Sequence, residues 1–208
     1  MIQANYFDDL GEEIGKEKRG RKKRATAQRI FVSAIDLMKE QGFDGVSIEQ
    51  ICERAQIARA TFFQHFRSKA ALLGLFSELV CQSIEKELEA KDLSATEQLE
   101  LVADHLQGLA NEMGSIFPDM LAAFTAEPGA GFRVDDPDTG ITPLVVQMIK
   151  SGQADGTFAE HLRAEDMAIS LVAAWVALAR NSISDPPRHT GDRMRTILRF
   201  YISGLSAS

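Results

Sequence analysis

The chain has 208 residues, of which 45% are hydrophobic and 25% are charged, as is typical of a folded globular protein. It contains no run of about 18 apolar residues, which excludes a transmembrane helix, and its first residues lack the basic start and apolar run of a secretion signal, so we expect a cytoplasmic protein. Cys52 and Cys81 lie in helical patterns, where we expect small buried side chains without redox or metal chemistry.

Charge is distributed unevenly along the chain. The formal net charge is −7, yet residues 16–69 contain 13 Lys and Arg against 6 Asp and Glu, whereas residues 70–208 contain 10 against 20. Seven of the bases lie between Lys16 and Arg24, in the run KEKRGRKKR. Such a run can be a solvated tail, but its position just before the motif described below favours contact with phosphate.

Apolar residues recur with helical spacing along the chain, and no stretch alternates with a period of two for long enough to predict a strand. Gly42 supplies a stop for the first helix, and residues 127–140, EPGAGFRVDDPDTG, form the clearest loop. The sequence therefore predicts an all-α protein. The expected helices span residues 22–41, 48–55, 60–66, 69–90, 95–113, 116–126, 143–153, 165–183 and 192–205.

The second of these helices has a complete start signal. Ser47 is placed as its N-cap and Gln50 completes a capping box, while Val46 and Ile51 occupy the two positions of a hydrophobic staple. The next short helix follows across a tight turn, and a longer helix flanks the pair on each side. This arrangement is typical of a helix-turn-helix, in which the second short helix enters the major groove of DNA.

Residues 46–73, VSIEQICERAQIARATFFQHFRSKAALL, resemble the DNA-binding segment of the tetracycline-repressor (TetR) family of bacterial regulators almost position for position. The resemblance covers residues 25–75 and implies a helix-turn-helix domain followed by a larger helical body that dimerises and holds an effector. We expect a flexible arm over residues 1–21, the DNA-binding domain over 22–67 and the body over 68–208. The matching positions are Gly42, Phe43, Ser47, Ile51, Ala55, Ile57, Thr61, Phe63 as an aromatic, His65, Phe66 and Lys69.

The resemblance also implies which residues meet DNA. Arg59, Thr61 and Gln64 would face base edges or nearby phosphates, and their chemistry suits guanine, thymine and adenine respectively. Lys69 would meet a phosphate at the start of the following helix. The predicted DNA-binding residues are Lys22, Lys23, Arg24, Ser47, Arg59, Ala60, Thr61, Phe63, Gln64, His65 and Lys69.

Three positions depart from the family pattern. Gln56 stands where the turn normally has Gly, so either it adopts a left-handed backbone at a cost of about 1 kcal/mol or the turn differs. Ala58 replaces the usual Ser or Thr and loses an N-cap worth about 1 kcal/mol. Phe63 replaces the usual Tyr, so a contact there can only be apolar or absent.

The resemblance implies an effector site and a dimer surface in the body. A Met and Phe stripe predicts an apolar or aromatic effector, although a plain core has the same pattern. The last two helices would form a four-helix bundle between two chains, unless their apolar stripe only completes the monomer's core. The candidate effector residues are His105, Met113, Phe117, Met120, Phe124 and Met148, and the candidate dimer residues are Leu171, Trp175, Leu178, Leu198, Tyr201 and Leu205.

These features predict a homodimeric regulator of transcription, a repressor released from a two-fold-symmetric operator by a small molecule, with no cofactor or metal. An all-α enzyme is the main alternative, but the histidines lack metal spacing and no nucleophile or phosphate-loop motif occurs. The loop after Asp136 has Gly140 and Gln147 where a calcium site needs acidic residues. A helical module whose basic arm binds membranes or RNA is the second alternative.

Overall fold

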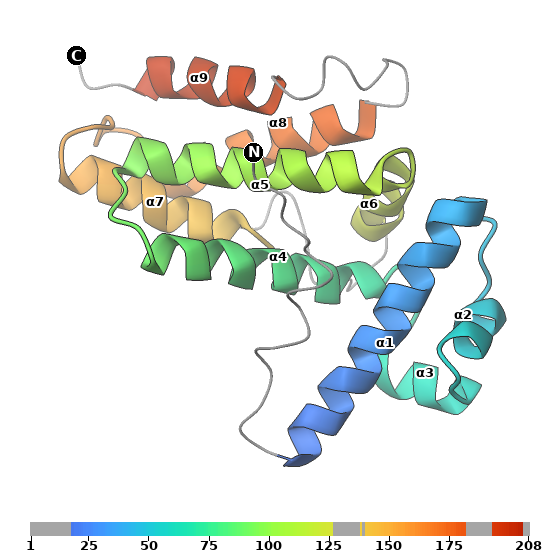
Figure 1. The fold of residues 1–208 in the computed structure, drawn as a ribbon. Coiled ribbons are helices and arrows are strands. Elements are labelled where there is room, and N and C mark those ends of the chain that lie inside the picture. Colours follow the sequence, from blue (N-terminus) through green and yellow to red (C-terminus); the bar gives the residue numbers. More distant parts are fainter. Residues whose placement is uncertain (1–17, 127–137, 139, 182–192, 206–208) are drawn as a thin grey trace. The chain divides into compact units, whose positions relative to one another are not determined.

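The computed structural model describes residues 18–126, 138, 140–181 and 193–205. Within these ranges the secondary structure consists of nine α-helices with no strand (Figure 1), which confirms the all-α prediction. The helices are α1 (Lys18–Gln41), α2 (Ile48–Arg54), α3 (Arg59–His65), α4 (Leu72–Glu89), α5 (Ala95–Met113), α6 (Ile116–Ala126), α7 (Thr142–Ala154), α8 (Ala164–Asn181) and α9 (Arg193–Leu205).

The helix ends agree with the predicted ends to different degrees. α5 and α6 begin and end at the predicted residues, whereas α1 begins earlier than predicted, at Lys18. α4 begins at Leu72 rather than at residue 69, although the Ser68 hydroxyl accepts a hydrogen bond from the Ala71 N–H at 3.0 Å, as its predicted capping role requires. Most of the predicted loop over residues 127–140 lies outside the described residues.

The chain forms two compact units, residues 1–73 and residues 74–208, which we call unit 1 and unit 2. The division falls in the first turn of α4, a few residues after the predicted domain boundary. Across the described helices of both units, none combines the length and apolarity that crossing a bilayer needs.

Unit 1 is built on the apolar stripe of α1, against which α2 packs, with α3 packed on α2. Phe31 of α1, Ile51 of α2 and Phe62 of α3 are fully buried, and burial of each such side chain contributes roughly 1.5–3 kcal/mol. Arg54 of α2 donates two hydrogen bonds of 2.9 Å to the Glu40 carboxylate of α1. These bonds lower the pKa of Glu40 from its ordinary value.

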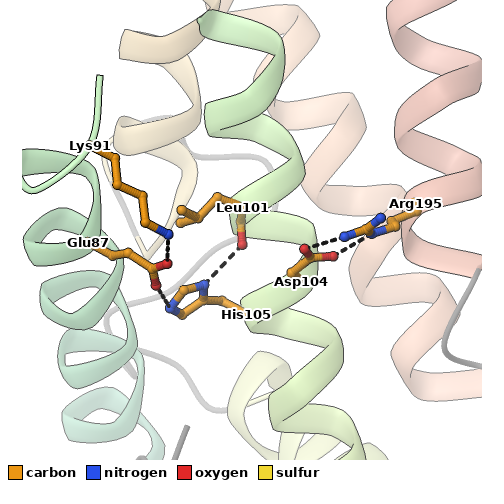
Figure 2. Close-up of polar contacts among 6 residues, drawn as sticks. All are labelled: Glu87, Lys91, Leu101, Asp104, His105 and Arg195. Carbon is orange, nitrogen blue, oxygen red and sulfur yellow. Dashed lines mark hydrogen bonds and ion pairs between the residues drawn. The ribbon is translucent and has the colours of Figure 1, made fainter. Parts of the chain in front are cut away.

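In unit 2, α7 packs on both α5 and α8, while α9 packs on α5 and α8. Trp175 of α8 is 2% exposed, and its indole N–H donates to the Met194 carbonyl of α9 at 3.3 Å. Arg195 of α9 donates to both carboxylate oxygens of Asp104 of α5 (Figure 2). A buried indole and a bidentate ion pair therefore fix α9 to the rest of unit 2.

Gly152 allows α7 to approach both its own following turn and α5. A β-carbon at this position would lie 2.3 Å from the Phe158 ring and 2.9 Å from the Ala95 β-carbon. Phe158 is fully buried, and its N–H donates to the Gly152 carbonyl at 2.8 Å. Only glycine fits this contact without displacing the aromatic ring.

Candidate nucleic-acid interface

The predicted capping box at the start of α2 is confirmed. The Gln50 N–H donates to the Ser47 hydroxyl at 3.2 Å, and the Ser47 N–H donates to the Gln50 side-chain oxygen at 2.8 Å. Val46 and Ile51, at the staple positions, are both buried. These contacts set the start of α2, and with it the position from which the turn to α3 begins.

The turn between α2 and α3 shows the predicted consequences of two departures from the family pattern. Gln56 has φ 53° and is the one non-glycine residue with positive φ in the described part of the chain. Ala58 has the extended backbone of an N-cap, φ −73° and ψ 149°, but supplies no side-chain hydrogen bond to α3. The turn thus keeps a left-handed geometry at a non-glycine residue, and α3 starts without a side-chain cap.

α3 has one buried face and one exposed face. Phe62 is fully buried and Phe66 is 6% exposed. The residues Arg59, Ala60, Phe63 and Gln64 are exposed, and their spacing places them on one side of the helix. Four predicted DNA-binding residues therefore share a solvent-facing surface, which we call the α3 face.

Arg59 has two close partners that sequence reasoning missed. Its Nη1 lies 2.6 Å from Oε1 of Glu49 on α2, and its guanidinium carbon lies 5.6 Å from the centroid of the Phe63 ring. The separation of Arg59 and Phe63 by four residues in one helix could have indicated the second contact. Glu49 lies ten positions away on another helix, so no local pattern indicates the first.

Lys69 is more enclosed than its predicted phosphate role implies. Its ammonium donates to the carbonyls of Phe43 and Val46, at 3.0 Å for Val46, and lies 4.3 Å from the centroid of the Phe43 ring. Burial lowers the pKa of Lys69 from its ordinary value, against a smaller raising effect of Asp44. Two of its three N–H donors thus bind the loop between α1 and α2, and a phosphate contact would use the third.

The other predicted DNA-contacting residues lie in less uniform surroundings. His65 is half-buried, and burial, followed by the nearby charge of Lys23, lowers its pKa from the ordinary value. Lys23 is exposed on α1. The backbone of Lys22 and Arg24 also belongs to α1, but their side chains lie outside the described set, as does most of the acidic and basic segment that precedes them.

The apolar residues predicted to surround an effector come from three helices of unit 2. Met113 of α5, Met120 of α6 and Met148 of α7 are each no more than 2% exposed. Phe117 is half-buried, and the side chain of Phe124 is not among those described. The three Met side chains therefore lie in the interior of unit 2. Their burial fits either a plain hydrophobic core or a ligand site.

His105 is buried, and both of its ring nitrogens have partners (Figure 2). Nδ1 lies 3.0 Å from the Leu101 carbonyl, and Nε2 lies 3.2 Å from Oε2 of Glu87 on α4. The other oxygen of Glu87 binds the Lys91 ammonium. His105 thus links α5 to α4, and an effector would have to displace one of these partners to bind its ring.

Among the described residues, two buried polar atoms that sequence reasoning missed have no hydrogen-bond partner. They are Oε1 of Gln107 on α5 and Oγ1 of Thr142 on α7; the amide nitrogen of Gln107 donates to Asn111 at 2.9 Å. Burying a polar atom without a partner costs roughly 1–3 kcal/mol. No periodic pattern in the sequence distinguishes these two residues from ordinary helix surface.

Three of the predicted dimer residues are buried within a single chain. Leu171, Trp175 and Leu198 are each no more than 2% exposed within a single chain. They form part of the core of unit 2, where α8 packs on α6, α7 and α9, and α9 also packs on α5. This burial favours the alternative stated for the apolar stripe, that it completes the monomer's own core.

The outer surface of α9 carries the apolar residues that a second chain could reach. Phe200 is 76% exposed, and sequence reasoning missed it because it lies off the main apolar stripe. Leu178 of α8 and Tyr201 of α9 are half-buried, whereas the side chain of Leu205 is outside the described residues.

Among the described side chains, no three His, Cys, Asp or Glu residues are grouped to hold a metal ion.

The helix-turn-helix of unit 1 has close relatives among known proteins. Residues 30–75 match the model of the bacterial regulatory proteins of the tetR family. The HTH-type transcriptional regulator YdeS of Bacillus subtilis strain 168 is 39% identical over 59 residues, which are 28% of this chain and 30% of YdeS. The HTH-type transcriptional regulator TcmR of Streptomyces glaucescens is 38% identical over 55 residues, 26% of this chain and 24% of TcmR. The matched part thus spans less than a third of either relative.

The fold of the whole chain is also similar to solved structures. The crystal structure of RolR with its ligand resorcinol has a TM-score of 0.62 and 20% identity, covering 90% of this chain and 91% of RolR. Together with the α2–α3 geometry, this likeness defines an all-α helix-turn-helix protein with a separate helical body. Residues 30–75 are therefore similar to the DNA-binding segment of the tetR family, and the rest of the chain shares only its fold with the solved structure.

Proposed function

We propose that the protein is a DNA-binding regulator of transcription that reads a two-fold-symmetric site with α3. The α3 face carries this proposal: it presents Arg59 and Gln64, which can read guanine and adenine, on a helix whose opposite side is buried. The excess of bases over acids in residues 16–69 adds attraction for phosphate. Such a function is exercised in the cytoplasm, where bacterial DNA lies.

The proposed symmetry requires a dimer, and the exposed surface of α9 supports one. Phe200 is the most exposed large apolar side chain among those described, and Tyr201 lies beside it with ring centroids 6.1 Å apart. Covering these rings with the same surface of a second chain gives a two-fold interface. A two-fold dimer would place two recognition helices about 34 Å apart, one turn of DNA.

We further propose that a small, mainly apolar or aromatic effector binds within unit 2 and releases the DNA. The buried Met residues of α5, α6 and α7 offer apolar contacts, and RolR, of similar fold, was solved with the aromatic ligand resorcinol. Ala95 lies beside Gly152, which indicates that α5 and α7 run antiparallel. Gln107 and Thr142 then both lie toward the other end of this pair, where their unpartnered oxygens could bind a hydroxyl group.

Release would proceed through α4. This helix begins in unit 1 and continues in unit 2, and its last turn holds His105 of α5 through Glu87. In this scheme α4 has two positions, and the effector binds the protein more tightly in one of them. Effector binding would shift the equilibrium toward that position and change the spacing of the recognition helices. Tight effector binding without any change in operator affinity would contradict this coupling.

The proposed function is tested by selecting binding sites from a genomic duplex library at controlled salt. We expect wild-type protein to select a two-fold-symmetric site, and the double variant Arg59→Ala plus Gln64→Ala to lose that selection. The matched control replaces the same residue types in unit 2, Gln147→Ala plus Arg163→Ala, and should select as wild type does. Binding that ignores sequence, or that prefers RNA or anionic vesicles, would favour the helical-module alternative. The similarity of residues 30–75 to DNA-binding regulators favours this function over the enzyme alternative.

A further inference from the structure

Two neighbours hold Arg59 at the start of α3. Glu49 Oε1 lies 2.6 Å from its Nη1, and the Phe63 ring supports the guanidinium at 5.6 Å. The ring is itself held in place, because Phe63 packs edge-on against the buried Phe62 with centroids 5.5 Å apart. The guanidinium thus has an anion at one end and an aromatic ring on one face.

The contact with Glu49 leaves a useful part of the guanidinium accessible. It engages Nη1, so the edge formed by Nε and Nη2 still presents two parallel N–H groups. Such an edge matches O6 and N7 of guanine, and a pair of this kind discriminates between bases by roughly tenfold to a hundredfold. The Arg59 side chain is 63% exposed, so this edge can reach a ligand.

The contacts of Arg59 contribute little to folding. The Glu49 side chain is 59% exposed, and ion pairs between two exposed side chains have small effects on stability. Glu49 also places a negative charge beside the α3 face, where it opposes the approach of phosphate. The charge of Glu49 weakens the general attraction to DNA. Its contact with Arg59 orients the guanidinium, and this orientation offsets the weaker attraction.

We propose that Glu49 and Phe63 are positioning residues that set the base specificity of Arg59; this inference rests on the proposed function. By restricting the rotamers of Arg59 they reduce the conformational entropy lost on contact with a base. They therefore increase discrimination between bases rather than total affinity. Phe63, which lacks the hydroxyl of the usual Tyr, acts here through its ring and not through phosphate.

The test uses the full chain and the duplex that wild-type protein selects from the library. Arg59→Ala first identifies the guanine at which discrimination is lost, and that base pair is then replaced to give a second duplex. Affinities for both duplexes and for an unrelated duplex are measured for Glu49→Gln and Phe63→Leu at one fixed salt concentration. Equal urea midpoints with wild type ensure that the variants are folded.

Glu49→Gln should change two quantities in opposite directions. Discrimination at the guanine should fall about two- to fivefold, the size expected for an exposed ion pair, while affinity for the unrelated duplex should rise because a negative charge is lost. The matched control is Glu53→Gln, one turn along α2 and exposed. It removes the same charge and should raise affinity for the unrelated duplex without loss of discrimination.

Phe63→Leu should lower discrimination about two- to fivefold, as expected for loss of an exposed cation–π contact. Phe63→Tyr keeps the ring and should retain the wild-type ratio. Wild-type ratios for both Glu49→Gln and Phe63→Leu, or no guanine at which Arg59→Ala acts, would overturn the inference while leaving operator selection intact. Failure of wild-type protein to select any duplex would instead refute the proposed function.

Discussion

The residues that open α3 depart from the family pattern without losing its geometry. Gln56 keeps the left-handed backbone that glycine normally supplies, and Ala58 keeps the extended N-cap backbone without a capping oxygen. At both positions a better-suited residue could adopt the same backbone conformation. Each therefore has a substitution that should stabilise the protein.

Ala58→Ser should raise the free energy of unfolding by about 0.5–1 kcal/mol. The backbone of Ala58 already has N-cap angles, so a serine hydroxyl can accept a hydrogen bond from an N–H in the first turn of α3. The measurement is urea unfolding followed by far-ultraviolet circular dichroism. Ala60→Ser, inside the exposed first turn of the same helix, adds the same hydroxyl without a cap and should give no gain. An equal response of the two variants would refute the capping argument.

Among the elements, the helices whose ends carry local signals were predicted best. The capping box at Ser47 and Gln50 placed the start of α2 from the sequence, because its hydrogen bonds join residues three apart. The start of α4 was placed too early, since Ser68 caps a turn that precedes the regular helix. Local chemistry predicts where a helix can begin, whereas the packing of the following turns decides where it does.

Contacts between elements were predicted less well. Periodicity identified the apolar stripe of α8 but could not show whether the monomer or a second chain covers it, and Leu171 and Trp175 proved to be core. The pairing of Glu49 with Arg59, and of His105 with Glu87, joins different helices. Such pairs depend on how the helices cross, which the helical repeat alone does not specify.

Gly152→Ala should destabilise the protein by about 1–3 kcal/mol, the usual cost of overpacking. The added β-carbon would lie 2.3 Å from the Phe158 ring, and both α5 and the turn after α7 would have to move. The measurement is the shift in thermal midpoint. Gly204→Ala is the matched control, because no atom lies within 4 Å of a β-carbon there. It should be neutral or stabilising by up to about 1 kcal/mol through helix propensity, and a loss as large as that of Gly152→Ala would contradict the packing argument.

At the scale of the whole molecule, the proposed function requires two chains, and the exposed rings of α9 are the surface proposed to join them. With Leu171, Trp175 and Leu198 buried in the core, the exposed apolar surface of α9 is centred on Phe200, which the sequence analysis did not predict. Interfaces of this kind depend on a few large apolar or aromatic side chains at their centre. A single charge at such a position should therefore separate the chains.

Phe200→Glu should convert the dimer to a monomer and weaken operator binding at least tenfold, because two recognition helices no longer act together. Mass is measured by light scattering after gel filtration. Leu162→Glu is the control, since Leu162 is also an exposed apolar residue, at 38%, but lies between α7 and α8. A Phe200→Glu protein that remains dimeric, with the same operator affinity, would place the interface elsewhere.

The single tryptophan of the chain has a consequence for how the two units can be observed. Trp175 lies in the core of unit 2, with its indole N–H on the Met194 carbonyl, and unit 1 contains no tryptophan. Tryptophan emission therefore reports the opening of α8 from α9 and is blind to the melting of α1, α2 and α3, whereas circular dichroism records both. Superimposable transitions by the two signals would mean that unit 1 and unit 2 unfold as one cooperative unit. Separated transitions would give the stability of each unit without cutting the chain.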